Sequence, residues 1–147
     1  MADTSLLADL ILDQMADAVI YADEQGIIQK WNRAAAALFG HNAAKAIGNS
    51  LDLIIPERLR AAHWRGFETA MKTGSMKLQG RPTLTRALHE SGGKLYVEMT
   101  FALVKDQTNA VRGAVAVARD VTARTLQEKA PARPGTLNPT ISPAQKE

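Results

Sequence analysis

The sequence predicts an α+β fold: a five-stranded antiparallel sheet with helices on one face, preceded by an amphipathic helix. Two observations support this. Apolar residues recur at helical spacing over residues 4–15 and 56–72, whereas they alternate with polar ones over residues 94–105. Two short β-prone runs near the N-terminus and three more after residue 74 account for the five strands.

The first element is expected to be a short helix over residues 4–15. One side of this helix carries an apolar stripe formed by Leu6, Leu7, Leu10 and Ile11, and two aspartates lie on the other side. The stripe must cover something, either the sheet of its own chain or a second copy of itself.

A hairpin and two short helices are expected next. Residues 17–23 and 27–31 are β-prone and flank a turn that contains glycine. Asn32 is a favourable N-cap for a helix over residues 33–39, and Gly40 is a favourable residue to end it. A second short helix is expected between an N-cap at position 42 and the glycine at position 48.

The longest helix is expected over residues 56–72. It begins with Pro56, a preferred first helical residue, and stops at Thr73-Gly74. A strand within residues 78–90 then ends in a Ser-Gly-Gly turn, and two further strands follow over residues 94–105 and 111–121.

Composition limits the class of protein. The 147 residues are 46% hydrophobic and 22% charged, which fits one globular domain. The chain has no cysteine, which excludes a disulfide scaffold, a thiol nucleophile and cysteine-ligated metals. No apolar run approaches the roughly 18 residues of a membrane span, and the N-terminus does not resemble a signal peptide. We expect a soluble, cytoplasmic protein that does not bind a membrane.

Charge and proline content separate the body from a tail. The net charge is +3, of which the residues after position 123 contribute +2. A nearly neutral body disfavours nucleic-acid binding. Residues 126–147 hold four of the six prolines and show no apolar period, so we expect a disordered tail or linker remnant there. The expected organisation is an amphipathic helix at 1–16, a core at 17–125 and this tail.

The order of these elements resembles a PAS domain over roughly residues 5–125. The residues that carry the resemblance lie in four segments, namely Ile27–Ala35, Pro56–Gly74, Ser91–Gly93 and Arg119–Thr122. The resemblance implies a sensory or interaction module rather than a catalyst. It also implies a ligand or cofactor pocket between the sheet and the long helix, and a following helix that carries the signal to an effector or partner. Alternatively, Asp120 and Thr122 simply cap that helix.

His63 is the leading candidate for contact with a ligand. It lies on the apolar face of the long helix, one turn after Leu59 and one turn before Phe67, and an imidazole placed there can ligate heme iron. Its position, ten residues before Thr73-Gly74, is similar to that of the proximal ligand in heme-binding PAS oxygen sensors. The resemblance therefore implies heme b with His63 as the metal ligand. A hydrogen-bonded core histidine without heme is the alternative.

The pocket wall is expected to comprise apolar residues at positions that could face inward, namely Leu78, Leu84, Val97, Met99 and Phe101. Met99 could be a sixth heme ligand or plain core packing. Those oxygen sensors bind the gas with an arginine on the strand after the helix. This chain has Thr83 in that slot, and the nearby Arg81 and Arg86 are expected to point elsewhere. Trp64 is expected to point about 100° away from the pocket face, toward a neighbouring strand or a partner subunit.

No arrangement typical of catalysis stands out, since the three histidines are far apart in sequence and no phosphate-binding loop is present. Two functions remain. The first is a module that senses a ligand, with heme as the leading candidate and gas or redox sensing as its use, and signals through a partner. The second is a cofactor-free association module, a homodimer formed through the N-terminal stripe and the outer sheet face.

Overall fold

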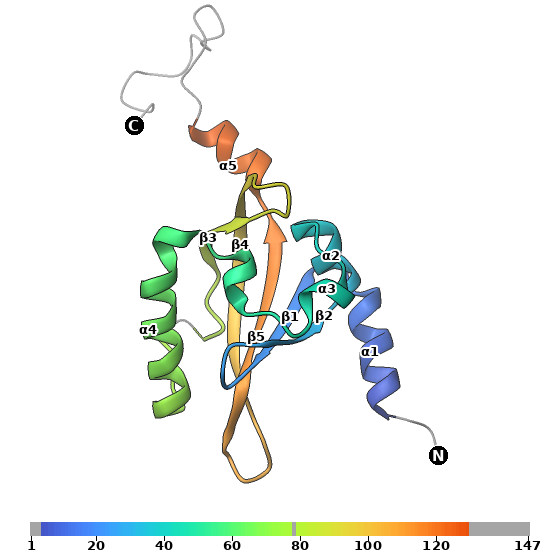
Figure 1. Cartoon of the computed structure of the whole chain (residues 1–147), viewed down its shortest axis with the longest axis vertical. Coiled ribbons are helices and arrows are strands. Elements are labelled where there is room, and N and C mark those ends of the chain that lie inside the picture. Colours follow the sequence, from blue (N-terminus) through green and yellow to red (C-terminus); the bar gives the residue numbers. More distant parts are fainter. Residues whose placement is uncertain (1–3, 78, 130–147) are drawn as a thin grey trace, which may run out of the picture.

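Five strands form one antiparallel sheet in the computed structural model, which describes residues 4–77 and 79–129 (Figure 1). The order across the sheet is β2-β1-β5-β4-β3. The strands are β1 (Ala18–Asp23), β2 (Ile28–Trp31), β3 (Thr83–Leu88), β4 (Lys94–Lys105) and β5 (Val111–Asp120). The predicted α+β fold with a five-stranded antiparallel sheet is confirmed.

The helices follow the predicted order. They are α1 (Thr4–Gln14), α2 (Arg33–Phe39), α3 (Ala43–Ala46), α4 (Glu57–Thr73) and α5 (Thr122–Lys129), together with a 3-10 helix, η1 (Leu51–Ile54). η1 was not among the predicted elements, because four residues are too few to show a period. The three elements α2, α3 and η1 contribute buried apolar side chains to the same core as the sheet.

The predicted helix ends at residues 32 and 40 are confirmed. The side chain of Asn32 accepts a hydrogen bond from the backbone N–H of Ala35 at 3.0 Å, which satisfies one of the free donors at the start of α2. Gly40 ends the helix in the left-handed conformation with φ of +85°. α4 begins one residue after Pro56, and Gly74 ends it in the same way at φ of +68°.

The face of the sheet that carries Val97, Met99 and Phe101, here called the inner face, packs on the core. Directly opposed residues in an antiparallel pair share a face. Met99 is opposed by Ala118 of β5 and by Thr83 of β3. Val97 and Met99 are buried, and both belong to the core cluster together with Phe39 of α2.

Leu84 lies on the other face of the sheet, so the expectation that it lines the inner pocket is wrong. Thr83 pairs with inward-facing Met99, and side chains alternate along a strand, so the next residue must point outward. Leu84 is accordingly 55% exposed. The segment before β3 shows no alternation, so its phase could not be read from the sequence.

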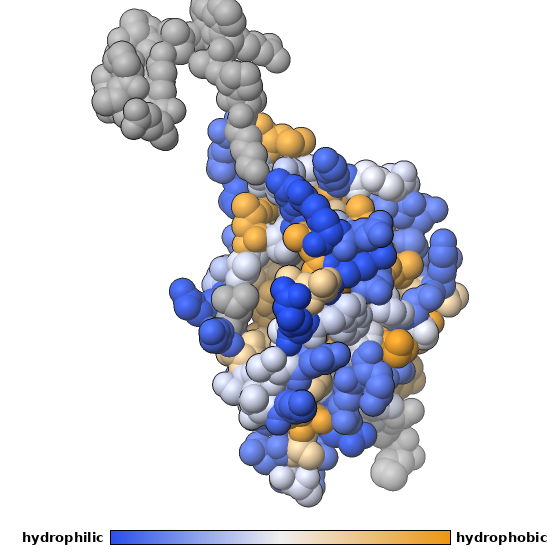
Figure 2. Space-filling view, turned by 60° about the vertical axis from the view of Figure 1, so that its left-hand side comes forward, coloured by the Kyte–Doolittle hydropathy of each residue, from blue (hydrophilic) through white to orange (hydrophobic). Residues whose placement is uncertain are grey.

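α4 presents a polar side to solvent. In Figure 2 the side of the molecule that carries α4 is turned forward, and this surface is largely hydrophilic. Its outward residues include Arg58, Arg65 and Lys72, which are exposed, whereas Phe67 and Ala70 are buried. This distribution is that of an amphipathic helix, and it agrees with the predicted apolar face.

α5 extends through Lys129, past the predicted start of the tail at residue 126. Its first residue, Thr122, is tied to β4, because the N–H of Tyr96 donates to Thr122 Oγ1 at 2.9 Å. Residues 130–147, with the disorder predicted for them, lie outside the described residues. Within the described ranges, no helix is both long and apolar enough to cross a membrane.

Candidate functional site

α4 brings together the three residues that helical spacing placed on one face. Leu59 and His63 are half-buried and Phe67 is 8% exposed. The ring centroids of His63 and Phe67 are 5.9 Å apart with an interplanar angle of 33°. Residues four apart on a helix are neighbours, so this contact follows directly from the sequence.

The electrostatic state of His63 is set mainly by burial. Burial lowers the pKa of its imidazole, whereas the nearby carboxylate of Asp52 has a smaller effect that raises this pKa. The lowered pKa favours the neutral imidazole, which is the form that ligates metals. Its Nδ1 atom is buried and has no hydrogen-bond partner among the described residues. A buried polar atom without a partner is unusual in folded proteins, and Nδ1 of His41 is a second such atom among the described residues.

Trp64, the next residue along α4, packs against the turn between β1 and β2. Its indole N–H donates to Asp52 Oδ1 in η1 at 2.8 Å. Its ring is so close to Gly26 that an added Cβ there would lie 2.3 Å from two of the ring carbons. The Trp64 side chain thus points away from the inner face, as predicted, and toward this turn.

The inner face of the sheet supplies the rest of the expected pocket wall. Val97 and Met99 are buried and Phe101 is half-buried, whereas Leu78 lies outside the described residues. Met99 is part of the core cluster, which favours packing as its role. Strand β5 contributes small side chains to this face, at Ala114, Ala116 and Ala118. Ala118 is buried, and Ala114 and Ala116 are half-buried.

The slot expected for a gas-binding arginine holds a threonine. Thr83 is half-buried on the inner face of β3, and its hydroxyl donates to the carbonyl of Arg81 at 3.3 Å. The one arginine of β3, Arg86, lies on the outer face, where its guanidinium carbon is 5.5 Å from the ring centroid of Tyr96. The prediction that Arg86 points elsewhere is confirmed.

The other two histidines meet at the end of α2. Burial lowers the pKa of His41, and the charges of Lys45 and His89 act in the same direction. The His89 imidazole lies against Gly40, where an added Cβ would be 2.7 Å from it. The burial of His41 was not predicted, because it follows an exposed glycine outside any periodic segment. The described part of the chain holds no cluster of three or more potential metal ligands.

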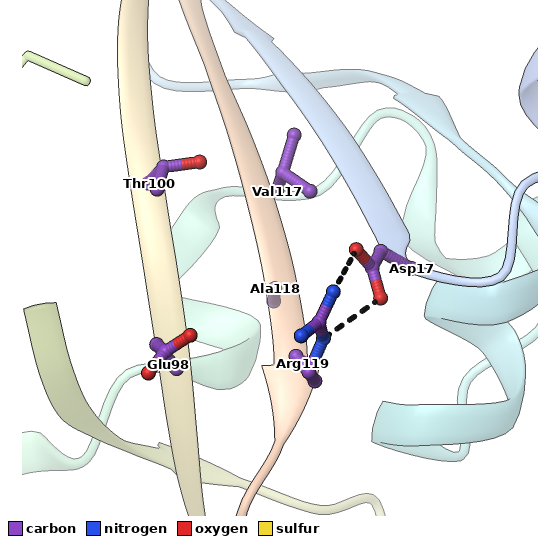
Figure 3. Close-up of a pocket in the computed structure, with 6 residues that line it drawn as sticks. All are labelled: Asp17, Glu98, Thr100, Val117, Ala118 and Arg119. Carbon is purple, nitrogen blue, oxygen red and sulfur yellow. Dashed lines mark hydrogen bonds and ion pairs between the residues drawn. The ribbon is translucent and has the colours of Figure 1, made fainter. Parts of the chain in front are cut away.

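A shallow hollow of about 100 Å³ lies on the outer face of the sheet (Figure 3). Asp17 and Arg119 close one side of it, with the guanidinium Nη2 and the carboxylate Oδ2 3.1 Å apart. The pair joins the start of β1 to the end of β5. Because the arginine is largely exposed, this ion pair adds little to stability.

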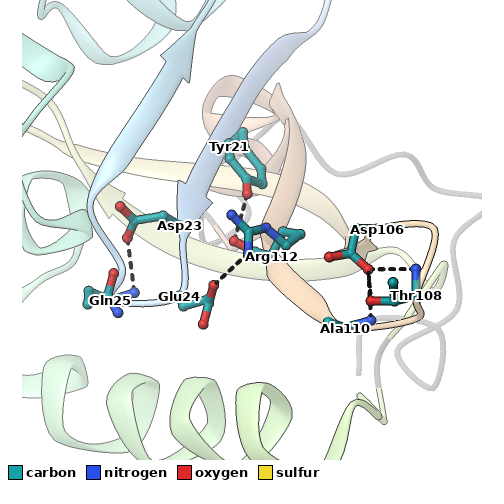
Figure 4. A network of polar contacts seen from close by, with 8 residues as sticks. All are labelled: Tyr21, Asp23, Glu24, Gln25, Asp106, Thr108, Ala110 and Arg112. Atoms are coloured by element: carbon teal, nitrogen blue, oxygen red, sulfur yellow. Dashed lines mark hydrogen bonds and ion pairs between the residues drawn. The ribbon is translucent and has the colours of Figure 1, made fainter.

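The carboxylates at the opposite end of the sheet cap turns (Figure 4). Asp23 accepts hydrogen bonds from the backbone of Gln25 at 2.9 Å, and Asp106 accepts from the backbone of Thr108 at 2.8 Å. Such local bonds stabilise turns. These two aspartates thus have a structural explanation and are not candidates for a ligand site.

The fold is a single antiparallel sheet in which α2, α3, η1 and α4 are inserted between the second and third strands, with α1 before the sheet and α5 after it. A family model described as the PAS fold matches residues 7–121. The chain therefore belongs to the PAS family, and the predicted resemblance is confirmed.

Two relatives are sensors. The oxygen sensor protein DosP of Escherichia coli is 25% identical over 118 residues, covering 80% of this chain and 14% of the relative. The sensor protein FixL of Bradyrhizobium diazoefficiens is 42% identical over 53 residues, covering 36% of this chain and 10% of the relative. The chain thus spans only a small part of the length of each of these relatives.

Among solved structures, the PAS domain of a Colwellia psychrerythraea protein superimposes with a TM-score of 0.70 at 22% identity. It covers 83% of this chain, and the match includes 100% of that domain. At this identity the match shows the fold alone.

Proposed function

We propose that the chain is a sensor domain that binds heme b between α4 and the inner sheet face, with His63 as the iron ligand. A gas or redox signal would then pass to a partner or effector. The observation that carries the proposal is the position of His63, a half-buried imidazole on the side of α4 that carries Leu59 and Phe67, with its ring 5.9 Å from that of Phe67. On this proposal the chain itself catalyses no reaction and acts in the cytoplasm.

The residues around His63 suit such a cofactor. Leu59 and Phe67 flank it on α4, and the inner face of β4 carries the apolar side chains of Val97 and Phe101. Thr83 would supply a hydroxyl in the slot where an arginine binds the gas in the oxygen sensors that this chain resembles. When bound, heme iron supplies a site for a diatomic gas or for one-electron exchange, and the polarity of the pocket tunes which occurs. The similarity to an oxygen sensor protein supports this choice.

The first test is the visible absorption spectrum of the purified protein before and after addition of hemin. We expect a sharp Soret band that shifts on reduction and on addition of CO. His63→Ala should abolish or alter this band, because the iron loses its protein ligand. His89→Ala is the matched control, since this histidine lies in the β3–β4 turn and makes its hydrogen bonds with Ser91. A native spectrum that stays flat, or a band unchanged in His63→Ala, would contradict the proposal.

The route of the signal is proposed to be α5. Thr122 exchanges hydrogen bonds with the backbone of Tyr96 in β4, at 2.9 and 3.3 Å. Tyr96 lies next to Val97, whose side chain faces the proposed pocket. A change beneath α4 that moves β4 would therefore also move the first turn of α5.

A second candidate function, homodimeric association, is favoured by α1. This helix has no buried residue, and the side chains of Leu7, Leu10 and Ile11 are 51–57% exposed. It is held to the rest of the chain by polar contacts, including Lys30 Nζ to Asp9 Oδ1 at 2.8 Å. Leu7, Leu10 and Ile11 are therefore available to a second copy, which would remove them from water.

Light scattering after gel filtration tests this association. We expect the native chain to have the mass of a dimer and Leu10→Glu to have the mass of a monomer, because a carboxylate would be buried in the interface. Ile47→Glu is the control, since Ile47 is a comparably exposed apolar residue on the α3 side. A native dimer that forms without any Soret band after hemin would favour association over heme sensing. A native chain with the mass of a monomer would contradict homodimeric association.

A further inference from the structure

We propose that Trp64 is the positioning residue of the ligand site: held by Asp52 and by the backbone of Gly26, it sets the orientation of the His63 imidazole. The inference rests on the proposed role of His63 as an iron ligand. The packing of the His63, Trp64 and Phe67 rings can, however, be tested in the protein without heme.

The orientation of His63 needs such a device. A histidine that binds a metal is usually oriented by a hydrogen bond from its other ring nitrogen to a neighbouring acceptor. The buried Nδ1 of His63 has no such partner among the described residues. The ring must therefore be oriented by packing.

Trp64 supplies that packing. Its ring meets His63 edge-on, with centroids 4.7 Å apart and an interplanar angle of 76°. It also meets Phe67 edge-on at 5.3 Å and 78°. Edge-to-face contacts of this kind are favourable and directional. His63 thus lies in a corner formed by the other two rings, and its rotation about χ2 is opposed by the indole.

The indole is itself held from two sides. On one side, its N–H donates to Asp52 Oδ1 at 2.8 Å. Arg60 of α4 holds the same segment, because its guanidinium donates to the backbone carbonyls of Asp52 and Ile55 at 3.2 and 3.0 Å. The backbone that carries Asp52 is therefore bound to α4 at more than one point.

On the other side, the indole lies on the turn between β1 and β2. Gly26 has φ of +77°, and a Cβ at this position would lie 2.3 Å from two ring carbons. The turn is fixed by Gly26 N–H to the Asp23 carbonyl at 2.9 Å and by Leu51 N–H to the Gly26 carbonyl at 3.0 Å. The ring therefore rests on a turn that two backbone hydrogen bonds hold in place.

Three variants each disturb one of these contacts. Trp64→Phe removes the indole N–H donor, and Asp52→Ala removes the carboxylate that accepts its hydrogen bond. Gly26→Ala adds a methyl group where the ring now lies. Asp52→Asn keeps an acceptor oxygen and is the conservative control. Gly92→Ala is the control for the glycine, since it has a similar φ of +88° but nothing within 4 Å of an added Cβ. The readouts are hemin affinity, the Soret spectrum, and the NMR shifts of the His63 ring protons in hemin-free protein.

We expect each of the three variants to weaken hemin binding about tenfold or more, as loss of a partner that orients a metal ligand does, and to broaden the Soret band. In hemin-free protein the His63 ring protons should shift, because the ring current of Trp64 changes. The effects of Trp64→Phe and Asp52→Ala should be non-additive when combined. The two controls should stay near native in both readouts.

The inference is overturned if the His63 protons of Asp52→Ala and Gly26→Ala match those of their controls in hemin-free protein. Failure of the proposed function has a different signature. In that case the native chain does not bind hemin, while the His63 shifts still follow the three variants and not the controls.

Discussion

Gly113→Ala should destabilise the protein by about 3 kcal/mol, the range of severe overpacking or backbone strain. Gly113 lies in β5 with φ of +156°, which side chains other than glycine rarely adopt. A Cβ there would lie 2.1 Å from the carbonyl oxygen of Ala22 and 2.7 Å from Tyr21 Oη.

Neither neighbour can move away cheaply. Ala22 belongs to β1, which pairs with β5 along its whole length, so a shift of its carbonyl breaks ladder hydrogen bonds in the middle of the sheet. Tyr21 is held because its hydroxyl donates to the carbonyl of Arg112 at 2.7 Å. The added methyl therefore meets groups that are fixed from both sides.

Urea unfolding followed by circular dichroism measures the effect. Gly66→Ala is the control. Gly66 is exposed to solvent in the middle of α4, and nothing lies within 4 Å of an added Cβ. That substitution should leave the stability unchanged or raise it by up to about 1 kcal/mol, the helix-propensity difference between the two residues. A Gly113→Ala variant as stable as the native chain would show that β1 and β5 are not packed as described.

Prediction from sequence succeeds where local chemistry decides the structure. The caps at Asn32 and Gly40 each satisfy backbone groups within one helix turn, and they lie where the sequence predicts them. The site on α4 is similar, because His63 and Phe67 are one turn apart and must share a face. These features need no knowledge of what packs against them.

Contacts between distant segments could not be predicted in the same way. The turn at Gly26 and the indole of Trp64 are far apart in sequence, and no periodicity links them. The outward direction of Leu84 depends on where β3 begins, which in turn depends on its pairing with β4. The missing partner of His63 Nδ1 is likewise a property of the packed molecule and not of α4 alone.

Asn32→Ala should cost about 3 kcal/mol, roughly a lost helix cap plus the unpaired buried groups it leaves. Asn32 is 3% exposed and uses both ends of its amide. Its Oδ1 accepts from the N–H groups of Val19 and Ala35 at 2.9 and 3.0 Å. Its Nδ2 donates to the carbonyls of Leu12 and Asp17 at 2.7 and 3.1 Å. One side chain thus joins α1, β1 and α2.

Asn32→Asp separates these roles, because a carboxylate keeps both acceptor contacts and loses both donor contacts. It also places a negative charge beside the carbonyl oxygens of Leu12 and Asp17. Hydrogen exchange should show native protection at the amides of Val19 and Ala35 and faster exchange along α1. Equal protection of α1 in this variant and in the native chain would mean that its other polar contacts suffice to hold it. If α1 is released, the proposed dimer should weaken although Leu10 and its neighbours are unchanged, because a stripe on a mobile helix must be ordered before it can associate.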